Sequence, residues 1–235
     1  MTSFLLLHGG AGPASVRAFA DRLAADTGAR VVAPAHPGFD GTERPAALTT
    51  IGHLARHYAD LLDELGLDDV CVVGNSIGGW IAAELGLLHP KRVSSLVIVD
   101  AVGIEVPGHP VADFFALTLP QVAQLSYADP ARFAIDPASL PPTAKTNRET
   151  LRVYAGEPSM TDPTLRARLA GLRLPTLVIW GEADRIADPA YGRAFADAIP
   201  GARFAELPAT GHLPQIESPE LLLPLVTTFA SHHSR

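Results

Sequence analysis

A serine between two glycines is the residue of this sequence best placed to act as a nucleophile. The segment Gly74–Gly78 reads Gly-Asn-Ser-Ile-Gly, follows the apolar run Val70–Val73 and precedes apolar residues at helical spacing. This order predicts a strand, a tight turn and a helix, with Ser76 held in a strained backbone conformation that exposes its hydroxyl. Glycines two residues before and two residues after Ser76 allow the strand and the helix to approach closely. Ser76 is therefore our candidate nucleophile.

A serine nucleophile needs a base, and the base needs an acid that orients it. The apolar run Leu177–Trp180 leads into a turn that carries Asp184, and the strand-like run Arg203–Leu207 leads into a loop that carries His212. Carboxyl ends of parallel strands lie along one edge of a sheet, so we expect both residues to meet Ser76 there. In this arrangement Asp184 orients His212, which takes the serine proton.

A glycine-rich turn near the N-terminus is a candidate for an oxyanion hole. The apolar run Phe4–Leu7 predicts a strand, and His8-Gly9-Gly10 follows it. Backbone N–H groups in such a turn can point at a developing negative charge, as can the N–H of the residue after the nucleophile. Our candidate donors are Gly10 and Ile77. A turn that simply requires glycine geometry explains these glycines equally well.

These motifs together make the chain resemble the α/β-hydrolase family. Besides the serine turn, the similarity lies in His8-Gly9, in Pro37-Gly38-Phe39, in Gly181-x-x-Asp184 and in Gly211-His212. It extends over nearly the whole chain except residues 103–171. The resemblance implies the α/β-hydrolase fold and a Ser-Asp-His triad, whereas the substrate stays open because this fold hosts many activities.

The expected core is an α/β domain of residues 1–102 and 172–235, with a mostly parallel sheet of about six strands flanked by helices. We expect helices around Ser15–Asp26 and Thr50–Leu65, a third from Pro189 toward Ala198 and a last one that begins after Ser218. The expected strands are Phe4–Leu7, Val31–Ala33, Val70–Val73, Leu96–Val99, Thr176–Trp180 and Arg203–Leu207.

Residues 103–171 contain nine prolines and no long periodic pattern. In the family that the chain resembles, an insertion after the sixth strand forms a lid, and this segment occupies that position. A lid excludes water and supplies walls that select the substrate. Short helices are expected over Val111–Leu119, Gln121–Tyr127 and Arg148–Tyr154. Candidate lining residues, most of which we expect simply to hold the lid together, are Phe114, Phe115, Leu117, Leu119, Leu125, Tyr127 and Phe133.

Several other polar residues are alternatives for the site. Asp100 follows the run Leu96–Val99, from which some members of this fold supply their acid, although the turn of Asp184 matches the common pattern better. His8 and His36 lie on loops at the same edge and either contact substrate or hydrogen-bond to the backbone. Basic residues of the lid, including Arg148, either meet an anionic substrate or lie on a solvated face.

Composition narrows the class of protein further. The 235 residues carry a net charge of −7, which argues against nucleic acid as a partner. Cys71 is the only cysteine and is expected in a buried strand. No run resembles a signal peptide or approaches membrane-spanning length, so we expect a cytoplasmic protein without a membrane partner. No His/Cys/Glu cluster has the spacing of metal ligands, and no cofactor is expected.

The favoured function is a serine hydrolase that cleaves a carboxylic ester of small to medium size through an acyl-enzyme. One alternative is a C–C bond hydrolase that acts on aromatic ring-fission products, because Asn75 and Gly78-Gly79 resemble the serine turn of that group. Leu213 stands where that group has tryptophan, and Arg148 is the best available counterpart for its substrate-binding arginine. A second alternative is a non-hydrolytic small-molecule receptor on the same fold. The sequence leaves the oligomeric state open.

Overall fold

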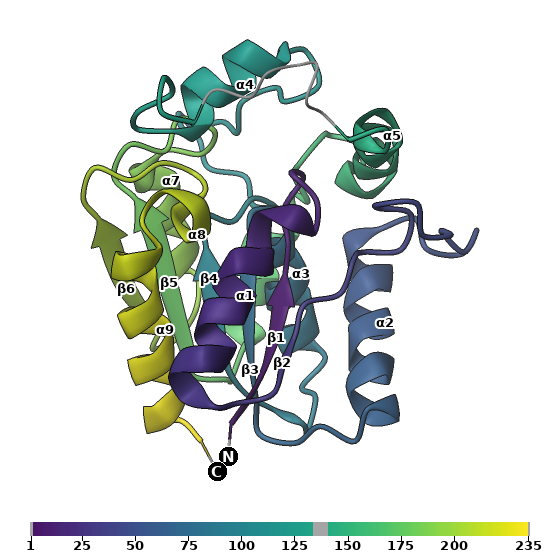
Figure 1. Ribbon diagram of the computed structural model, residues 1–235, viewed down its shortest axis with the longest axis vertical. Coiled ribbons are helices and arrows are strands. Elements are labelled where there is room, and N and C mark those ends of the chain that lie inside the picture. The colour runs from purple at the N-terminus through teal and green to yellow at the C-terminus, as the bar shows by residue number, and fades with distance from the viewer. Residues whose placement is uncertain (1, 134–140, 235) are drawn as a thin grey trace.

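A six-stranded parallel sheet forms the centre of the molecule (Figure 1). The computed structural model describes residues 2–133 and 141–234. The strand order is β2-β1-β3-β4-β5-β6, and every neighbouring pair is parallel. The expected α/β fold is thereby confirmed. The strands are β1 (Ser3–Leu7), β2 (Val31–Val32), β3 (Val70–Asn75), β4 (Val93–Val99), β5 (Thr176–Gly181) and β6 (Arg203–Leu207).

Helices cover both faces of this sheet, which explains why its four central strands are buried throughout and mainly apolar. Helices α1 (Ala14–Thr27) and α9 (Pro219–His232) pack on one face, where Cys71 lies in the core. Burial raises the pKa of the Cys71 thiol to about 12, in agreement with its expected role as a small apolar residue. The other face packs against α2 (Ile51–Glu64), α3 (Ile77–Leu87) and α7 (Pro189–Asp197).

The helix boundaries follow local signals in the sequence. The Thr50 side chain accepts a hydrogen bond from the His53 N–H and caps α2, whose buried residues lie on one face as expected. Asp188 caps α7 through the Tyr191 N–H, and proline occupies the first helical position. Helix α9 contains Pro224 in its interior. Within the described residues, no helix is both long and apolar enough to span a bilayer.

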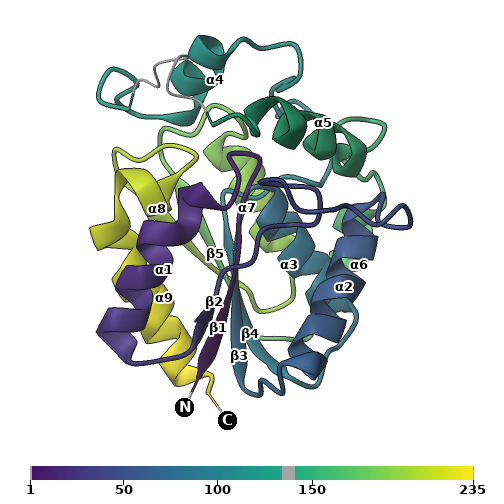
Figure 2. The same ribbon diagram turned by 45° about the vertical axis from the view of Figure 1, so that its right-hand side comes forward.

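Residues 103–171, here called the insertion, place two helices over the carboxyl ends of the strands (Figure 2). These are α4 (Leu119–Ser126) and α5 (Ala144–Ala155), close to two of the expected helices. The end of the insertion, with α6 (Leu165–Arg168) and the 3₁₀ turn η2 (Leu169–Gly171), packs into the core through Leu165 and Leu169.

The helix expected over Val111–Leu119 is wrong. This segment is irregular, with only a short turn at its centre. Nη2 of Arg148 on α5 donates to the carbonyls of Phe114, Phe115 and Leu117 at 3.0–3.2 Å. The N–H of Ala112 donates to the Ile186 carbonyl, which ties the start of this segment to the loop after β5. Arg148 therefore pairs the Phe114 and Phe115 carbonyls, which a helix over this segment would have paired internally.

Candidate active site

Ser76 sits at the sharp turn between β3 and α3, with φ 57° and ψ −119°. A non-glycine residue with positive φ is strained and persists where the surrounding structure enforces it. Close packing does so here, because a Cβ atom on Gly74 would lie 2.1 Å from the Gly78 carbonyl oxygen. A Cβ atom on Gly78 would lie 2.1 Å from the Leu7 carbonyl oxygen. The two glycines thus have the role that the sequence predicted for them.

An acid–base pair lies on two neighbouring loops of the same edge. Asp184 follows β5, His212 follows β6, and the Asp184 Oδ2 and His212 Nδ1 atoms are 2.7 Å apart. The other carboxylate oxygen, Oδ1, accepts N–H groups from Ile186 at 2.8 Å and Ala187 at 3.2 Å. Both side chains of the pair are buried. The carboxylate is therefore fixed by the backbone on one side and aligns the imidazole on the other.

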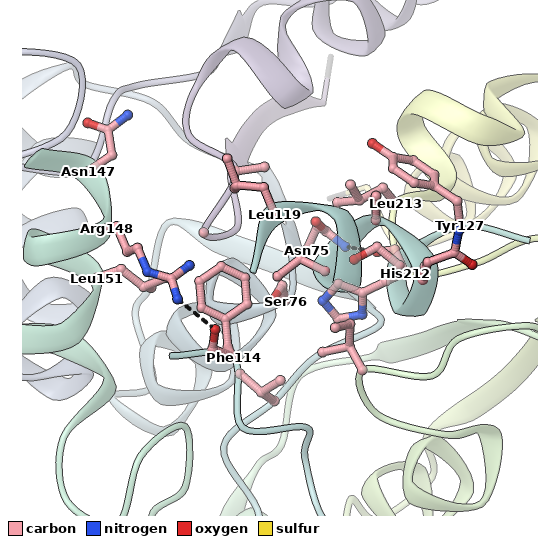
Figure 3. Close-up of a pocket in the computed structure, with 18 of the residues that line it drawn as sticks. Asn75, Ser76, Phe114, Leu119, Tyr127, Asn147, Arg148, Leu151, His212 and Leu213 are labelled. Carbon is pink, nitrogen blue, oxygen red and sulfur yellow. Dashed lines mark hydrogen bonds between the residues drawn. The ribbon is translucent and has the colours of Figure 1, made fainter. Parts of the chain in front are cut away.

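Ser76 and His212 face a common cavity of about 400 Å³ (Figure 3). The Ser76 side chain is partly exposed to it, and its hydroxyl forms no hydrogen bond within the described residues. In unliganded enzymes such contacts often tighten only when substrate binds. The structure thus gathers Ser76, Asp184 and His212 at the carboxyl ends of β3, β5 and β6, where the sequence placed them.

The glycine turn after β1 runs directly against the serine turn. A Cβ atom on Gly9 would lie 2.9 Å from the Ser76 Cβ, and Gly10 lines the cavity. Neither the Gly10 N–H nor the Ile77 N–H has a hydrogen-bond partner within the described part of the chain. Two free donors beside a serine have the arrangement that an oxyanion hole requires.

His8 and His36 are fully buried and line no part of the cavity. The His8 Nδ1 lies 2.7 Å from the Gly9 carbonyl, and its Nε2 accepts the His36 N–H. The His36 Nε2 lies 2.8 Å from the His8 carbonyl, and its Nδ1 lies 2.5 Å from the Tyr58 hydroxyl. Burial lowers the pKa of His8 to about 4 and holds that of His36 well below its ordinary value. Of the two interpretations from sequence, backbone hydrogen bonding is therefore correct.

The loop of His212 is held by residues to which the sequence analysis gave no such role. The Asn75 Nδ2 donates to the His212 carbonyl at 2.9 Å (Figure 3). The Gln215 Nε2 in turn donates to the Asn75 Oδ1 at 3.1 Å. From the insertion, the Ser126 carbonyl accepts the His212 N–H at 2.6 Å. The position of Asn75 next to the nucleophile is the only signal that could have indicated this network.

Glu217 joins the insertion to this loop. It belongs to α8 (Pro214–Glu217), and its Oε2 accepts the Gly211 N–H at 2.5 Å. Its Oε1 accepts the N–H groups of Ala128 at 2.9 Å and Asp129 at 3.3 Å. The end of α4 is therefore fastened to the same loop that carries His212.

Asp100, the alternative acid, lies beside the pair but is not bonded to the imidazole. It is fully buried after β4, and its Oδ1 accepts the Gly181 N–H at 2.8 Å. Atoms of Asp100, Asp184 and His212 lie within 4.8 Å of one another, close enough to share a cation. However, ligand atoms about 2 Å from a tetrahedral zinc ion lie more than roughly 3 Å apart. The 2.7 Å between the Asp184 Oδ2 and the His212 Nδ1 is a hydrogen-bond distance.

The wall of the cavity is mainly apolar. Of the lining residues predicted from the insertion, Phe114, Leu119 and Tyr127 contribute to it. Phe115, Leu117 and Leu125 do not line it, and Phe133 stacks on Tyr127 with ring centroids 4.9 Å apart. Arg148 contributes a guanidinium group to the wall (Figure 3). Other apolar contributors include Val111, Val122, Leu151, Met160, Ile186 and Leu213.

A strained serine turn on a parallel sheet, with histidine and aspartate on later loops, defines a hydrolase of the α/β class. The sequence model of the alpha/beta hydrolase family matches residues 4–225, and the chain belongs to this family. It is therefore an enzyme of a hydrolase family. This outcome agrees with the resemblance seen in the sequence motifs.

Relatives within the family differ in their reactions. The chain is 31% identical to 2-hydroxymuconate semialdehyde hydrolase of Pseudomonas putida, a match that covers 96% of this chain and 85% of the relative. It is also 31% identical to the putative non-heme bromoperoxidase BpoC of Mycobacterium tuberculosis, over 92% and 88% of the two chains.

Solved structures of the same fold are equally varied. The meta-cleavage product hydrolase CumD of Pseudomonas fluorescens IP01 superimposes with a TM-score of 0.80 at 20% identity, over 99% of this chain and 91% of that one. An esterase of Exiguobacterium antarcticum gives a TM-score of 0.80 at 19% identity, over 98% and 92%. At these identities the structural likeness defines the fold alone.

Proposed function

We propose that this protein is a serine hydrolase that cleaves a carboxylic ester of small to medium size through an acyl-enzyme. The observation that carries this proposal is the buried Asp184–His212 hydrogen bond at a cavity that also exposes Ser76. A fixed carboxylate keeps the imidazole in the tautomer whose free Nε2 can accept a proton. The proposed partner is accordingly a small molecule, with no role for nucleic acid or membrane, and the proposed location is the cytoplasm.

In the proposed reaction Ser76 attacks the ester carbonyl while His212 removes its proton. The N–H groups of Gly10 and Ile77 stabilise the oxyanion, and Asp184 stabilises the imidazolium that forms. Protonated His212 then delivers its proton to the departing alcohol. A water molecule activated by His212 attacks the acyl-enzyme and releases the acid, which restores the Ser76 hydroxyl.

The apolar wall supports an uncharged acyl group as substrate. Aromatic and aliphatic side chains of the insertion form much of the wall, so that each buried methylene contributes about 0.8 kcal/mol of binding free energy. A cavity of about 400 Å³ sets the limit of this gain. The insertion acts as a lid in this proposal, because it covers the site and excludes water from the acyl-enzyme.

C–C bond hydrolysis is the second candidate function, and the guanidinium of Arg148 favours it. Its Nη2 donates to three backbone carbonyl groups. Because Arg148 lines the cavity, the remaining N–H groups of its guanidinium are available to a substrate carboxylate. The relative from Pseudomonas putida is named as a hydrolase of 2-hydroxymuconate semialdehyde. Against this reading, Leu213 rather than tryptophan follows the histidine.

A fluorophosphonate label combined with two substrate panels tests these proposals. We expect rapid labelling of Ser76 and turnover of p-nitrophenyl esters. Rapid cleavage of a dienol-diketone acid with negligible ester turnover would instead establish the C–C hydrolase. Slow labelling with almost no turnover of either panel would indicate the non-hydrolytic receptor.

A further inference from the structure

Asp100 is a fully buried acid to which the proposed mechanism assigns no role. It follows β4 and has a positive φ of 43°, a conformation that aspartate and asparagine adopt more readily than most residues. Its Oδ1 accepts the Gly181 N–H, whereas its Oδ2 is buried without a partner that donates to it. A buried ionised oxygen without a donor is costly, so the second oxygen requires an explanation.

The neighbouring titratable groups explain why the Asp100 Oδ2 is buried without a donor. Asp184, His212 and Glu217 are the titratable groups that act on Asp100, from the loops after β5 and β6 and from α8. Two buried carboxyl groups at such short range cannot both be ionised without a large energetic penalty. One proton must therefore be held between Asp100 and Asp184.

The hydrogen-bond donors decide which carboxyl group keeps that proton. Asp184 accepts from three donors, namely the N–H groups of Ile186 and Ala187 and the ring of His212. Asp100 accepts from one, the Gly181 N–H. Donors favour the ionised form, so the negative charge belongs on Asp184. Burial and the charge of Asp184 raise the pKa of Asp100 well above its ordinary value, although the hydrogen bond from the Gly181 N–H acts in the opposite direction.

We propose that Asp100 is a protonated carboxylic acid whose O–H donates to the Asp184 carboxylate and so helps to fix the group that orients His212. Asp100 is then a positioning residue, since it acts through Asp184 and touches no substrate. The positioning role rests on the proposed serine-hydrolase function, whereas the protonated state of Asp100 does not. The pair carries one negative charge, which balances the imidazolium that forms during the reaction.

The pH dependence of the free energy of unfolding tests whether Asp100 holds a proton. Wild type and Asp100→Asn are unfolded with urea between about pH 5 and 8, because asparagine supplies the same donor and acceptor without a titrating group. If folding retains a proton on Asp100, stability is lost as pH rises above the ordinary aspartate value of 3.8. The folding equilibrium constant of Asp100→Asn should then rise relative to wild type by about tenfold per pH unit, until the raised pKa is reached.

Asp162→Asn provides the matched control for this measurement, because its partners Thr164 and Arg168 do not titrate between about pH 5 and 8. Partial burial, the largest single effect, raises the pKa of Asp162, but hydrogen bonds from Thr164 and Arg168 together outweigh it and lower that pKa. Its contribution to stability is therefore lost only as pH falls, and the ratio to wild type should be flat above about pH 5. A ratio equally flat for Asp100→Asn would show that Asp100 is ionised in the folded protein and would overturn the proposal.

The kinetics of Asp100→Asn and of a second variant, Asp100→Gly, test the positioning role of Asp100. Asp100→Asn keeps a donor toward Asp184 and should reduce kcat by no more than about threefold. Asp100→Gly tolerates the positive φ, removes the donor and should reduce kcat by about ten- to a hundredfold with little change in KM. A loss in Asp100→Asn as large as in Asp184→Asn would mean that Asp100 acts as a carboxylate. Equal rates for Asp100→Gly and Asp100→Asn would remove the positioning role.

The two measurements separate this inference from the proposed function. If the protein hydrolyses none of the substrates, the urea titrations still decide whether Asp100 holds a proton. If Ser76 is labelled and esters turn over, but the stability ratio is flat, the serine hydrolase stands and the role of Asp100 falls.

Discussion

Replacement of Asp184 by asparagine isolates the contribution of the acid without removing its shape. Oδ1 of Asp184 accepts two backbone N–H groups, from Ile186 and Ala187, and only an oxygen can keep them. The asparagine oxygen must take this position, so its NH₂ group faces the Nδ1 of His212. That nitrogen must then accept a hydrogen bond, and the ring proton moves to Nε2.

A proton on Nε2 prevents His212 from acting as the base for Ser76. We therefore expect Asp184→Asn to reduce kcat by about 10⁴-fold, equivalent to about 5.4 kcal/mol of transition-state stabilisation. The loss should appear in kcat and in kcat/KM alike, because the substrate does not touch Asp184. The assay is steady-state hydrolysis of a p-nitrophenyl ester, with thermal unfolding to verify that the variant is folded.

Asp188→Asn, four residues further along the same loop, is the matched control for this rate measurement, since asparagine caps a helix as well as aspartate does. It should change kcat by less than about twofold. A folded Asp184→Asn variant that kept kcat within about tenfold of wild type would refute the reasoning from tautomers. A larger loss in Asp100→Asn than in Asp184→Asn would move the orienting acid to the end of β4.

Three further outcomes follow from the same geometry. Ser76→Ala should remain folded and lose several orders of magnitude in rate, keeping about 10³-fold over water, and retention of most activity would disprove its role as the nucleophile. On p-nitrophenyl esters, kcat/KM should rise with acyl length over the first few carbons and then fall, whereas a flat series would contradict an apolar acyl pocket. Stability should fall between about pH 6.5 and 4, because unfolded His8 and His36 take up protons that the folded forms exclude. Asp100 opposes this with one proton, so urea unfolding should give a net slope of about 1.4 kcal/mol per pH unit, and a slope of zero or of opposite sign would contradict these assignments.

The sheet was predictable because most of its strands are short apolar runs bounded by turn residues. The bounds of β6 agree with the expected run Arg203–Leu207, and β3 exceeds its expected run by two residues, Gly74 and Asn75. Parallel pairing followed from the alternation of strands and helical patterns along the chain. Apolar runs, turn residues and the order of strands and helices can all be read from the sequence without knowledge of long-range contacts.

The insertion was less predictable because long-range contacts determine its backbone. Residues Val111–Leu119 are apolar enough to suggest a helix, yet Arg148, more than thirty positions away, satisfies three of their neighbouring carbonyls. Nothing in the periodicity of the segment indicates that contact. Composition could indicate that aromatic residues would gather there, but not that Phe114 would line the cavity and Phe115 would not.

The same distinction applies within the site. Ser76, Asp184 and His212 each follow a strand, and strand ends are visible in the sequence. The contacts that hold their loops join residues far apart, such as Asn75 with Gln215 and Asp100 with Gly181. Their polar side chains look ordinary in the sequence, so only the fold reveals that they are buried against the acid–base pair.

The insertion, as well as the sheet, holds the loops that carry Asp184 and His212. The Arg185 guanidinium, one residue after Asp184, donates to the carbonyls of Gln124 and Tyr127 at the end of α4. Glu217 fastens the residues after Tyr127 to the loop of His212. This end of the insertion thus belongs to the structural support of the acid–base pair. Any opening that admits substrate while the pair stays aligned must therefore leave these contacts intact.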